Sequence, residues 1–414
     1  MTSLDQSNPH GGCQRQSQNP LGSGKPSLRS YTKETATVLC AVLLAGLTGS
    51  LLAADLKPVP SGIYDLTYDV AHNADFDLNL NPVIDNPNVD GFRLRISWAS
   101  IQPDNGDEYD WENLDNAIAA VTAHGKKLCI AIAAGLWTPD WVYTSAPVVY
   151  KYAMQEKDPV TRLSLGNQPL PWDTAYQAKW KKFLAAFGAR YDSNPALSYV
   201  VIGGFMEQFN MYIANIQEDI VGLTNLAKNP PAGYPGLVTP YPDFGTAYTP
   251  AAQDMISTYI TDFPTTSLIL TFTVVFPNDL GLTLANQLLA WGKETYPIHF
   301  GVMNSSLFAT PSPHDPPPPP LTYIKGYQLV CRAVDNPAWL YQDPDPTPIP
   351  PAPQPLQDAL ETGVSADGIF IEVYEGDLTQ DQSQPVLAAE RPKLLANVWD
   401  GKPPDPPTGL HFVW

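Results

Sequence analysis

The sequence has few cysteines and few histidines. Among its 414 residues there are 4 cysteines and 6 histidines. Cys13 and Cys40 precede the part of the chain that has folding signals, and Cys129 and Cys331 lie in apolar runs that are typical of strands. This arrangement matches neither a disulfide framework nor the ligand spacing of a zinc site. No histidine lies three or four residues from another, so we expect neither a metal nor a cofactor.

Positive charge is also scarce. The chain has 23 Lys and Arg against 42 Asp and Glu, a net charge of −19. Because proteins bind nucleic acids by neutralising phosphates with Lys and Arg, this balance argues against a nucleic-acid partner. By contrast, aromatic residues are plentiful, with 10 Trp and 20 Tyr. Flat rings that stack on sugar faces suit a carbohydrate-binding cleft, and a Trp-rich core is the ordinary alternative.

Long apolar runs are missing except near the N-terminus. Residues 35–54 are apolar and uncharged, and they follow a polar leader, residues 1–33, that ends in basic residues. This pattern predicts a signal peptide and a secreted or periplasmic protein. The run is near the lower length limit for a spanning helix, so a retained membrane anchor on an extracytoplasmic protein is the alternative.

From residue 62 onward, short apolar runs alternate with helical patterns, which is typical of a parallel βα fold. There are eight strand candidates, which is the number of strands in a closed (β/α)8 TIM barrel. A doubly wound open sheet is the alternative, but the Gly-rich phosphate turn that it favours after an early strand is missing. The strand candidates are Ile63–Val70, Gly91–Trp98, Lys127–Ala134, Leu197–Phe205, Ser267–Phe276, Ile298–Ser305, Gly326–Ala333 and Gly368–Tyr374. The helix candidates are Trp111–His124, Ala175–Tyr191, Pro250–Thr261, Gly281–Thr295 and Pro355–Thr362.

Proline is concentrated late in the chain, in three stretches of low complexity. We predict that residues 311–320 and 343–355 are surface insertions in the barrel and that residues 403–407 belong to a tail or linker. The predicted domains are a leader with a signal peptide (1–54), one barrel (55–399) and a Pro-rich tail (400–414). Two connections after strands, residues 138–174 and 207–249, are long. Long loops at the carboxyl ends of barrel strands commonly form the site.

The most specific pattern lies in Gly91–Asp115, GFRLRISWASIQPDNGDEYDWENLD. An alternating strand ends at Trp98, an Asn-Gly turn follows, and a helix begins near Trp111. The pattern Arg…Trp…Gln-Pro…Gly…Tyr-Asp-Trp…Leu-Asp resembles the second βα unit of clan A glycoside hydrolases, most closely the family 42 β-galactosidase-like barrels. The resemblance implies a (β/α)8 barrel that cleaves O-glycosidic bonds of a β-linked oligo- or polysaccharide.

Two glutamates are candidates for the catalytic pair that glycoside hydrolysis by retention requires. Glu207 follows the fourth strand candidate, where the resemblance places the acid/base, with Met206 in place of the family's Asn. Glu372 lies in an otherwise apolar strand, where a carboxylate is costly to bury without a partner or a site, and it is the candidate nucleophile. The alternatives are a solvated Glu207 and a Glu372 that points into the barrel and bonds an arginine. Glu375 and Asp377 are the reserve candidates.

The arginine best placed to support Glu372 is Arg93, because its spacing to Trp98 matches the clan and a guanidinium can hold a carboxylate with two donors. Arg95 shares its face and is the alternative. Trp98 is included with Arg93 among the substrate-binding candidates. Gly203 and Gly204 are expected to permit close packing rather than to bind phosphate.

Three further residues complete the predicted binding site. Trp137 and Trp141 flank a Thr-Pro-Asp segment that resembles the family's, and they could form a sugar platform. Gln328 lies in the seventh strand candidate, where the family has its nucleophile, and an amide cannot form the glycosyl-enzyme ester. The departures at Met206 and Gln328 favour a second hypothesis, an exported barrel without catalysis that binds polysaccharide. A surface structural module is the third.

Overall fold

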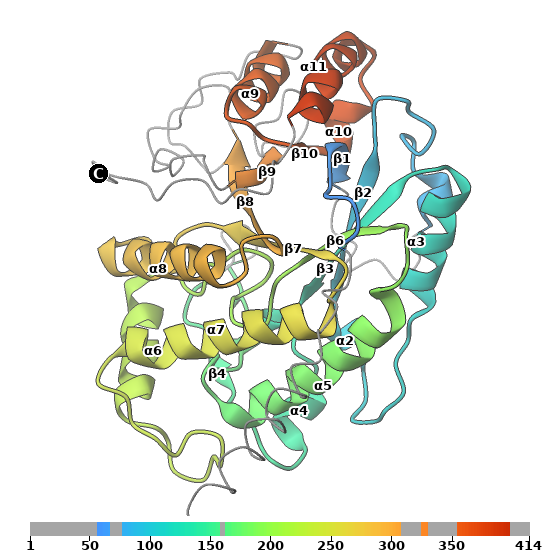
Figure 1. Ribbon diagram of the computed structural model, residues 1–414. Coiled ribbons are helices and arrows are strands. Elements are labelled where there is room, and N and C mark those ends of the chain that lie inside the picture. The colour runs from blue at the N-terminus through green and yellow to red at the C-terminus, as the bar shows by residue number, and fades with distance from the viewer. Residues whose placement is uncertain (1–55, 67–76, 158–161, 308–323, 330–353, 398–414) are drawn as a thin grey trace, which may run out of the picture. The chain divides into compact units, whose positions relative to one another are not determined.

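Eight parallel strands close into a barrel in the order β1-β10-β9-β8-β7-β6-β3-β2 (Figure 1). The computed structural model describes residues 56–66, 77–157, 162–307, 324–329 and 354–397. Within these ranges, it describes only the backbone, and not the side chains, of residues 305, 306, 324–329, 354 and 355. Every neighbouring pair of barrel strands is parallel, which confirms the (β/α)8 barrel and excludes the open sheet. The barrel strands are β1 Gly62–Leu66, β2 Gly91–Ser97, β3 Lys127–Ala133, β6 Leu197–Val201, β7 Ser267–Phe272, β8 Phe300–Leu307, β9 Ile324–Leu329 and β10 Phe370–Tyr374.

Helices follow the strands and cover the outside of the barrel (Figure 1). All five predicted helices are present, although α7 begins at Phe244 rather than at Pro250. Two longer helices, α6 (Gln217–Lys228) and α11 (Gln384–Ala396), and the short helices α2, α4 and α10 were not predicted from the sequence. The longer helices are α3 Glu112–Ala123, α5 Thr174–Tyr191, α6 Gln217–Lys228, α7 Phe244–Asp262, α8 Asp279–Thr295, α9 Gln354–Ser365 and α11 Gln384–Ala396. The shorter ones are α2 Trp98–Ile101, α4 Asp140–Thr144, α10 Glu375–Leu378, η2 Leu78–Leu80, η3 Gly135–Trp137 and η5 Asp381–Ser383.

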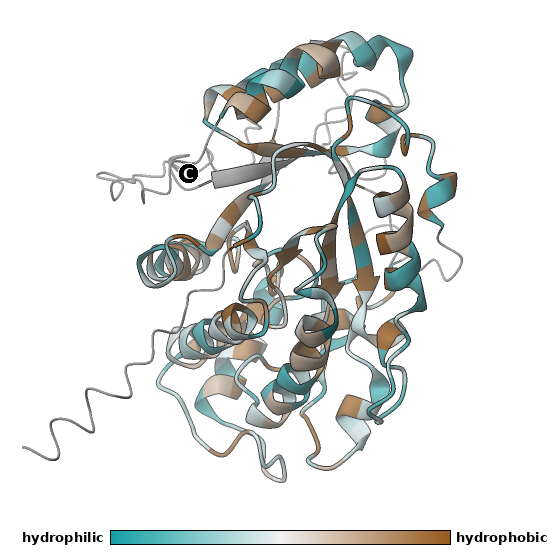
Figure 2. Cartoon of the chain, turned by 45° about the vertical axis from the view of Figure 1, so that its right-hand side comes forward, coloured by the Kyte–Doolittle hydropathy of each residue, from teal (hydrophilic) through white to brown (hydrophobic). Residues whose placement is uncertain are grey.

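The strands separate two apolar clusters. Alternate residues of β2 (Phe92, Leu94 and Ile96) pack outward against the helices, as the two-residue period of a strand requires. The inner cluster fills the barrel and contains Tyr64, Cys129, Ala131, Tyr199, Val201, Ile269, Met303, Ile369 and Phe370. Figure 2 shows helices that carry both hydrophobic and hydrophilic residues, as expected when one side faces the strands and the other faces water.

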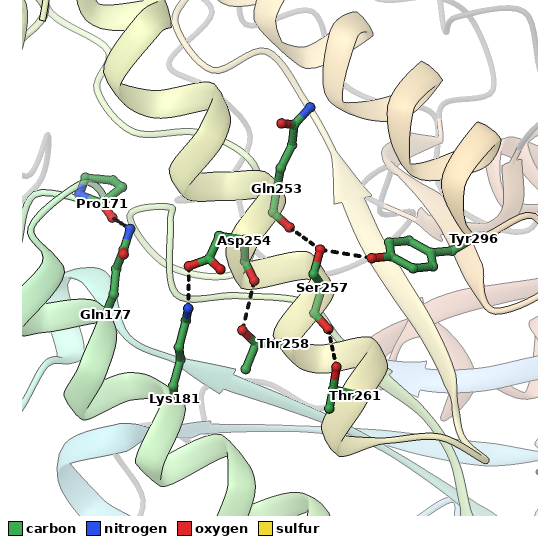
Figure 3. Close-up of polar contacts among 9 residues, drawn as sticks. All are labelled: Pro171, Gln177, Lys181, Gln253, Asp254, Ser257, Thr258, Thr261 and Tyr296. Atoms are coloured by element: carbon green, nitrogen blue, oxygen red, sulfur yellow. Dashed lines mark hydrogen bonds and ion pairs between the residues drawn. The ribbon is translucent and has the colours of Figure 1, made fainter. Parts of the chain in front are cut away.

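Polar contacts at the surface join neighbouring helices. Lys181 of α5 forms an ion pair with Asp254 of α7 (Figure 3). In the next turn of α7, the Ser257 hydroxyl donates to the Gln253 carbonyl at 2.8 Å and accepts a hydrogen bond from the Tyr296 hydroxyl at 2.9 Å. These contacts fix the helices around β6 and β7.

Several predictions fall outside the described residues. They concern the apolar segment 35–54, the insertion at 311–320, most of the stretch at 343–355, and the tail at 403–407. None of the helices in the described part of the chain has both the length and the hydropathy needed to cross a membrane.

Candidate active site

Glu207 lies beyond the carboxyl end of β6, after a tight glycine turn. The strand ends at Val201, four residues earlier than the predicted end, because Gly204 has a φ of +93°. A Cβ at Gly204 would lie 2.2 Å from Nε1 of Trp180. The Tyr176 hydroxyl also donates to the Gly204 carbonyl at 2.6 Å. As expected, this glycine serves close packing.

The backbone of Glu207 is fixed from two sides. Its N–H donates to the Tyr212 carbonyl at 2.8 Å, and its carbonyl accepts from the Leu136 N–H at 3.0 Å. Gly135, which precedes Leu136 in η3, has a φ of +48°, and a Cβ there would lie 2.0 Å from the Glu207 carbonyl oxygen. Only glycine fits this approach, so the loop after β3 sets the position of Glu207.

The side chain of Glu207 is 7% exposed. Burial raises the pKa of its carboxyl from 4.5 to about 8, with a further rise from the negative charges of Glu156 and Asp219, while a hydrogen bond from Gln208 opposes the shift. At neutral pH such a carboxyl keeps its proton. A protonated carboxyl at the mouth of a barrel is equipped to act as a general acid.

Glu372 lies inside the barrel on β10, the eighth barrel strand along the chain, and is 0% exposed. Nη1 of Arg93 donates to its Oε2 at 2.6 Å, and the Tyr199 hydroxyl donates to its Oε1 at 2.6 Å. Burial alone would lower the pKa of Arg93, but the negative charge of Glu372, the interactions with Cys129 and Tyr199 and the hydrogen bond to Glu372 together outweigh burial, and the pKa is raised. The arginine partner that the sequence suggested for Glu372 is therefore present.

Tyr199 and Phe209 link the surroundings of the two glutamates. Tyr199 belongs to β6, the strand that leads to Glu207, and β6 lies opposite β10 in the closed barrel. Two residues after Glu207, the ring of Phe209 lies 5.9 Å from Cζ of Arg93 and 5.5 Å from Cζ of Arg95, and it packs on the inner cluster. The segment that carries Glu207 therefore also covers the charges beside Glu372.

The three tryptophans differ in their placement. Trp98 is 0% exposed, and its ring centroid lies 5.0 Å from that of Trp180 and 5.7 Å from that of Trp141. The structure thus places Trp98 in the core, outside any position for stacking on a sugar. Trp141 is partly buried and donates through Nε1 to the Gln102 carbonyl at 2.8 Å. Trp137, at the end of η3 and partly exposed, remains the candidate platform.

The remaining candidates lie near β10. Gln328 is opposite Glu372 in the backbone register of β9 and β10, and its side chain lies outside the described residues. Glu375, the first residue of α10, accepts from Nδ2 of Asn81 at 2.9 Å, and burial raises the pKa of its carboxyl. Asp377 is buried in the same helix. In the described part of the chain, no cluster of three His, Cys, Asp or Glu side chains could hold a metal ion.

Four residues near the site were missed by the sequence analysis. Tyr199 contacts Glu372, Phe209 covers Arg93, and the charges of Glu156 and Asp219 act on Glu207. Tyr199 could have been found, because the two-residue period of β6 places it on one face of the strand. The other three lie in long connections, and nothing in their local sequence indicates which side chains those connections bring together.

The family comparison covers the strands that position Glu207. A family model described as Beta-galactosidase, that of glycoside hydrolase family 42, matches residues 84–218. This part of the barrel is therefore similar to family 42. The matched region includes the pattern at Gly91–Asp115 and Glu207, and it ends before Glu372. No curated protein sequence matches the chain.

The chain is also similar to solved structures at low sequence identity. The catalytic domain of β-amylase from Paenibacillus polymyxa is 9% identical over 79% of this chain and 95% of that chain, with a TM-score of 0.49. A family 42 β-galactosidase from G. stearothermophilus is 12% identical over 84% of this chain and 58% of that chain, with a TM-score of 0.48. A β-galactosidase from Bacillus circulans sp. alkalophilus is 16% identical over 64% and 42%, with a TM-score of 0.38. The chain thus spans less than two thirds of either β-galactosidase.

Proposed function

We propose that this barrel hydrolyses O-glycosidic bonds of a β-linked oligo- or polysaccharide with retention of configuration. The observation that carries the proposal is Glu207, a glutamate after barrel strand 4 whose pKa is raised to about 8. A carboxyl that is protonated at neutral pH can donate its proton to the leaving oxygen of a glycoside. The family 42 match over the surrounding residues supports this role.

Glu372 is the proposed nucleophile. In a retaining mechanism the second carboxylate attacks the anomeric carbon, and the two carboxyl groups lie about 5–5.5 Å apart. Arg93 and Tyr199 would hold the carboxyl group of Glu372 in a fixed orientation for this attack. Because Glu372 is 0% exposed, the proposal requires the structure to open beside Glu372 when a sugar enters. Trp137 would then offer a stacking surface.

The test compares two substrates, an aryl β-galactoside with an activated leaving group and an unactivated β-linked disaccharide. Glu207→Gln should abolish hydrolysis of the disaccharide and spare the first step with the aryl glycoside, because an activated group departs without a proton. Glu372→Gln should abolish turnover of both. Glu218→Gln, an exposed change in the first turn of α6, is the control. Wild-type rates in Glu372→Gln would contradict the assigned nucleophile.

A second candidate function is polysaccharide binding without catalysis. The observation that favours it is that both oxygens of the fully buried Glu372 are already bonded, one to Arg93 and one to Tyr199. In that case the wild-type protein hydrolyses neither substrate, so variants of Glu207 and Glu372 have no turnover to lose. Trp137→Ala then weakens the retention of the protein on an insoluble β-linked polysaccharide.

We also propose that the protein is exported and that residues 35–54 are removed as a signal peptide. The support is the apolar, uncharged run after a basic leader. N-terminal sequencing of the mature protein tests this. A chain that begins at Met1 and stays in the membrane would indicate the alternative anchor, and a cytoplasmic chain that begins at Met1 would contradict export.

A further inference from the structure

The inner cluster of the barrel has a partly buried apolar side chain packed on it at each end. In the described part of the chain, these side chains are Val59 and Phe209. Val59 precedes β1, and the N–H of the nearby Lys57 donates to the Thr265 carbonyl at 2.8 Å, just before β7. Val59 therefore lies at the amino ends of the strands, on the floor of the barrel. Phe209 follows β6 and lies at the carboxyl ends, at the mouth.

One layer of inward side chains inside the barrel contains Glu372. In the register of the strands, Arg93 lies beside Cys129, and Cys129 lies beside Tyr199. Arg93 and Tyr199 both donate hydrogen bonds to Glu372. The Glu372 layer is thus made of four side chains, each 0% exposed: Arg93, Cys129, Tyr199 and Glu372.

The ring of Phe209 lies against two guanidinium groups. Its centroid is 5.9 Å from Cζ of Arg93, in the Glu372 layer, and 5.5 Å from Cζ of Arg95, two residues nearer the mouth on β2. Within the described ranges, Nε and Nη2 of Arg93 are buried and have no hydrogen-bond partner. An aromatic face attracts a guanidinium but leaves such N–H groups without an acceptor, so a ligand with acceptor oxygens could replace the ring.

The loop that carries Phe209 is short and fixed at its base. The Glu207 N–H donates to the Tyr212 carbonyl at 2.8 Å, and the Met211 N–H donates to the carbonyl of Thr271, in β7, at 3.2 Å. Residues 208–210, between these points, belong to neither a helix nor a strand. A partly exposed side chain can change its rotamer without a change in the fold. Phe209 can therefore turn while the backbone of Glu207 stays in place.

We propose that Phe209 is the gate of the barrel: its ring closes the mouth over the Glu372 layer and turns aside to admit a sugar. The inference rests on the proposed function for the nature of the ligand. When the ring leaves Arg93, sugar hydroxyl groups can accept hydrogen bonds from its Nε and Nη2. The same movement gives a sugar a path to the carboxyl group of Glu372, which is 0% exposed while the ring is in place.

Cys129 can report the opening of the gate without any need for catalysis. Its thiol belongs to the Glu372 layer, and burial is the main cause that raises its pKa, so it should react only when that layer opens. The full-length chain is treated with iodoacetamide at one fixed, mildly alkaline pH. Mass spectrometry of the peptide that contains Cys129 measures its labelling separately from that of the other cysteines.

Phe209→Ala should raise the labelling rate of Cys129 by about tenfold, because the contacts that favour the closed state are lost. Phe209→Tyr keeps the ring and should label like the wild type. Val59→Ala is the matched control, because Val59 packs on the same cluster from the floor, and it should leave the rate unchanged. Labelling through local opening should depend weakly on low concentrations of urea, whereas labelling through global unfolding rises steeply.

The outcomes separate the gate from the proposed function. An unchanged rate in Phe209→Ala overturns the gate, even in a chain that hydrolyses glycosides. An equal rise in Val59→Ala, or a rise with the urea dependence of global unfolding, also overturns it, because access would then come from a loosened fold. A local rise confined to Phe209→Ala, in a chain that hydrolyses neither the aryl β-galactoside nor the disaccharide, supports the gate and counts against the proposed function.

Discussion

Glu207 and Glu372 are both buried glutamates in one barrel, but their surroundings are opposite. Glu207 has carboxylates as its charged neighbours, and its pKa rises to about 8. The neighbours of Glu372 are the guanidinium of Arg93 and the phenol of Tyr199, and each donates a hydrogen bond of 2.6 Å to one oxygen of the Glu372 carboxyl group. Burial is the main cause of the raised pKa of Glu207, and its acidic neighbours add to it, whereas the equally buried Glu372 is held in an ion pair with Arg93.

The proposed retaining mechanism would use this difference, with Glu207 as the protonated acid and Glu372 as the second carboxyl group, held by Arg93. The difference also shows where each role is controlled. The charges that act on Glu207 come from the hairpin formed by β4 Tyr152–Ala153 and β5 Asn167–Gln168 and from α6, both inserted in the long connections. The partners of Glu372 come from barrel strands β2 and β6. Changes to either group should alter its own glutamate and spare the other.

The largest effect is expected at the buried ion pair. Arg93→Met leaves Glu372 without a cation at a site where both side chains are 0% exposed. Removing one partner of a buried pair costs about 3–5 kcal/mol in the free energy of unfolding. Urea unfolding measures the loss. The double variant Arg93→Met, Glu372→Leu should recover part of it, and a double variant no more stable than the single would show that the pair is not the cause.

The next effect is expected at Gly135. Its Cβ would lie 2.0 Å from the Glu207 carbonyl oxygen, so Gly135→Ala must displace the backbone of Glu207. A misplaced catalytic group costs about 100-fold in rate, and we expect a fall of that order in kcat/KM. Gly125→Ala is the matched control, because Gly125 has a φ of +65° with nothing within 4 Å of its Cβ position. Equal losses in the two variants would attribute the effect to backbone strain alone.

A smaller and graded effect is expected from pH. If Glu207 is the acid, kcat/KM should fall tenfold per pH unit above about 8, the pKa of its carboxyl. The same shift affects stability, because a pKa raised from 4.5 to about 8 on folding favours the folded state while the group is protonated. That contribution is complete below about pH 4.5 and is lost as the pH rises through about 8. Glu207→Gln should remove both dependences, and a dependence that persists would assign them to another group.

The barrel could be predicted from sequence because its signals are local. Each strand candidate is a short apolar run with its own period, and all eight strands are present. The predicted ends of the strands and helices were less accurate. Strand β6 ends before the glycine turn at Gly204, and α7 begins after its N-cap residue Asp243, before the predicted start at Pro250. Helix α6 was missed although Ile220, Leu223 and Ala227 have helical spacing, because it lies in a connection that was interpreted as a loop.

The site was less predictable because its contacts are not local. Arg93 was paired with Glu372 from a family pattern, across 279 positions of sequence. Nothing comparable indicated that the Asp219 carboxylate would accept a hydrogen bond from the Glu156 N–H, since a lone aspartate in a helical first turn is common. Trp98 shows the converse. Its pattern suggested a sugar contact, but the aromatic residues of α5 pack on it and place it in the core.

The smallest effect is expected at an ion pair on the surface, and it tests whether burial is what gives Arg93 its importance. Lys181 and Asp254 are bonded like Arg93 and Glu372, but their side chains are 35% and 48% exposed (Figure 3). Exposed pairs contribute about 0–1 kcal/mol, because water solvates each charge when the other is removed. Lys181→Met should therefore change the free energy of unfolding by less than about 1 kcal/mol. If Lys181→Met lost as much free energy of unfolding as Arg93→Met, the loss of any ion pair, buried or exposed, would be enough to explain the cost at Glu372. Burial would then not be the reason for the importance of Arg93.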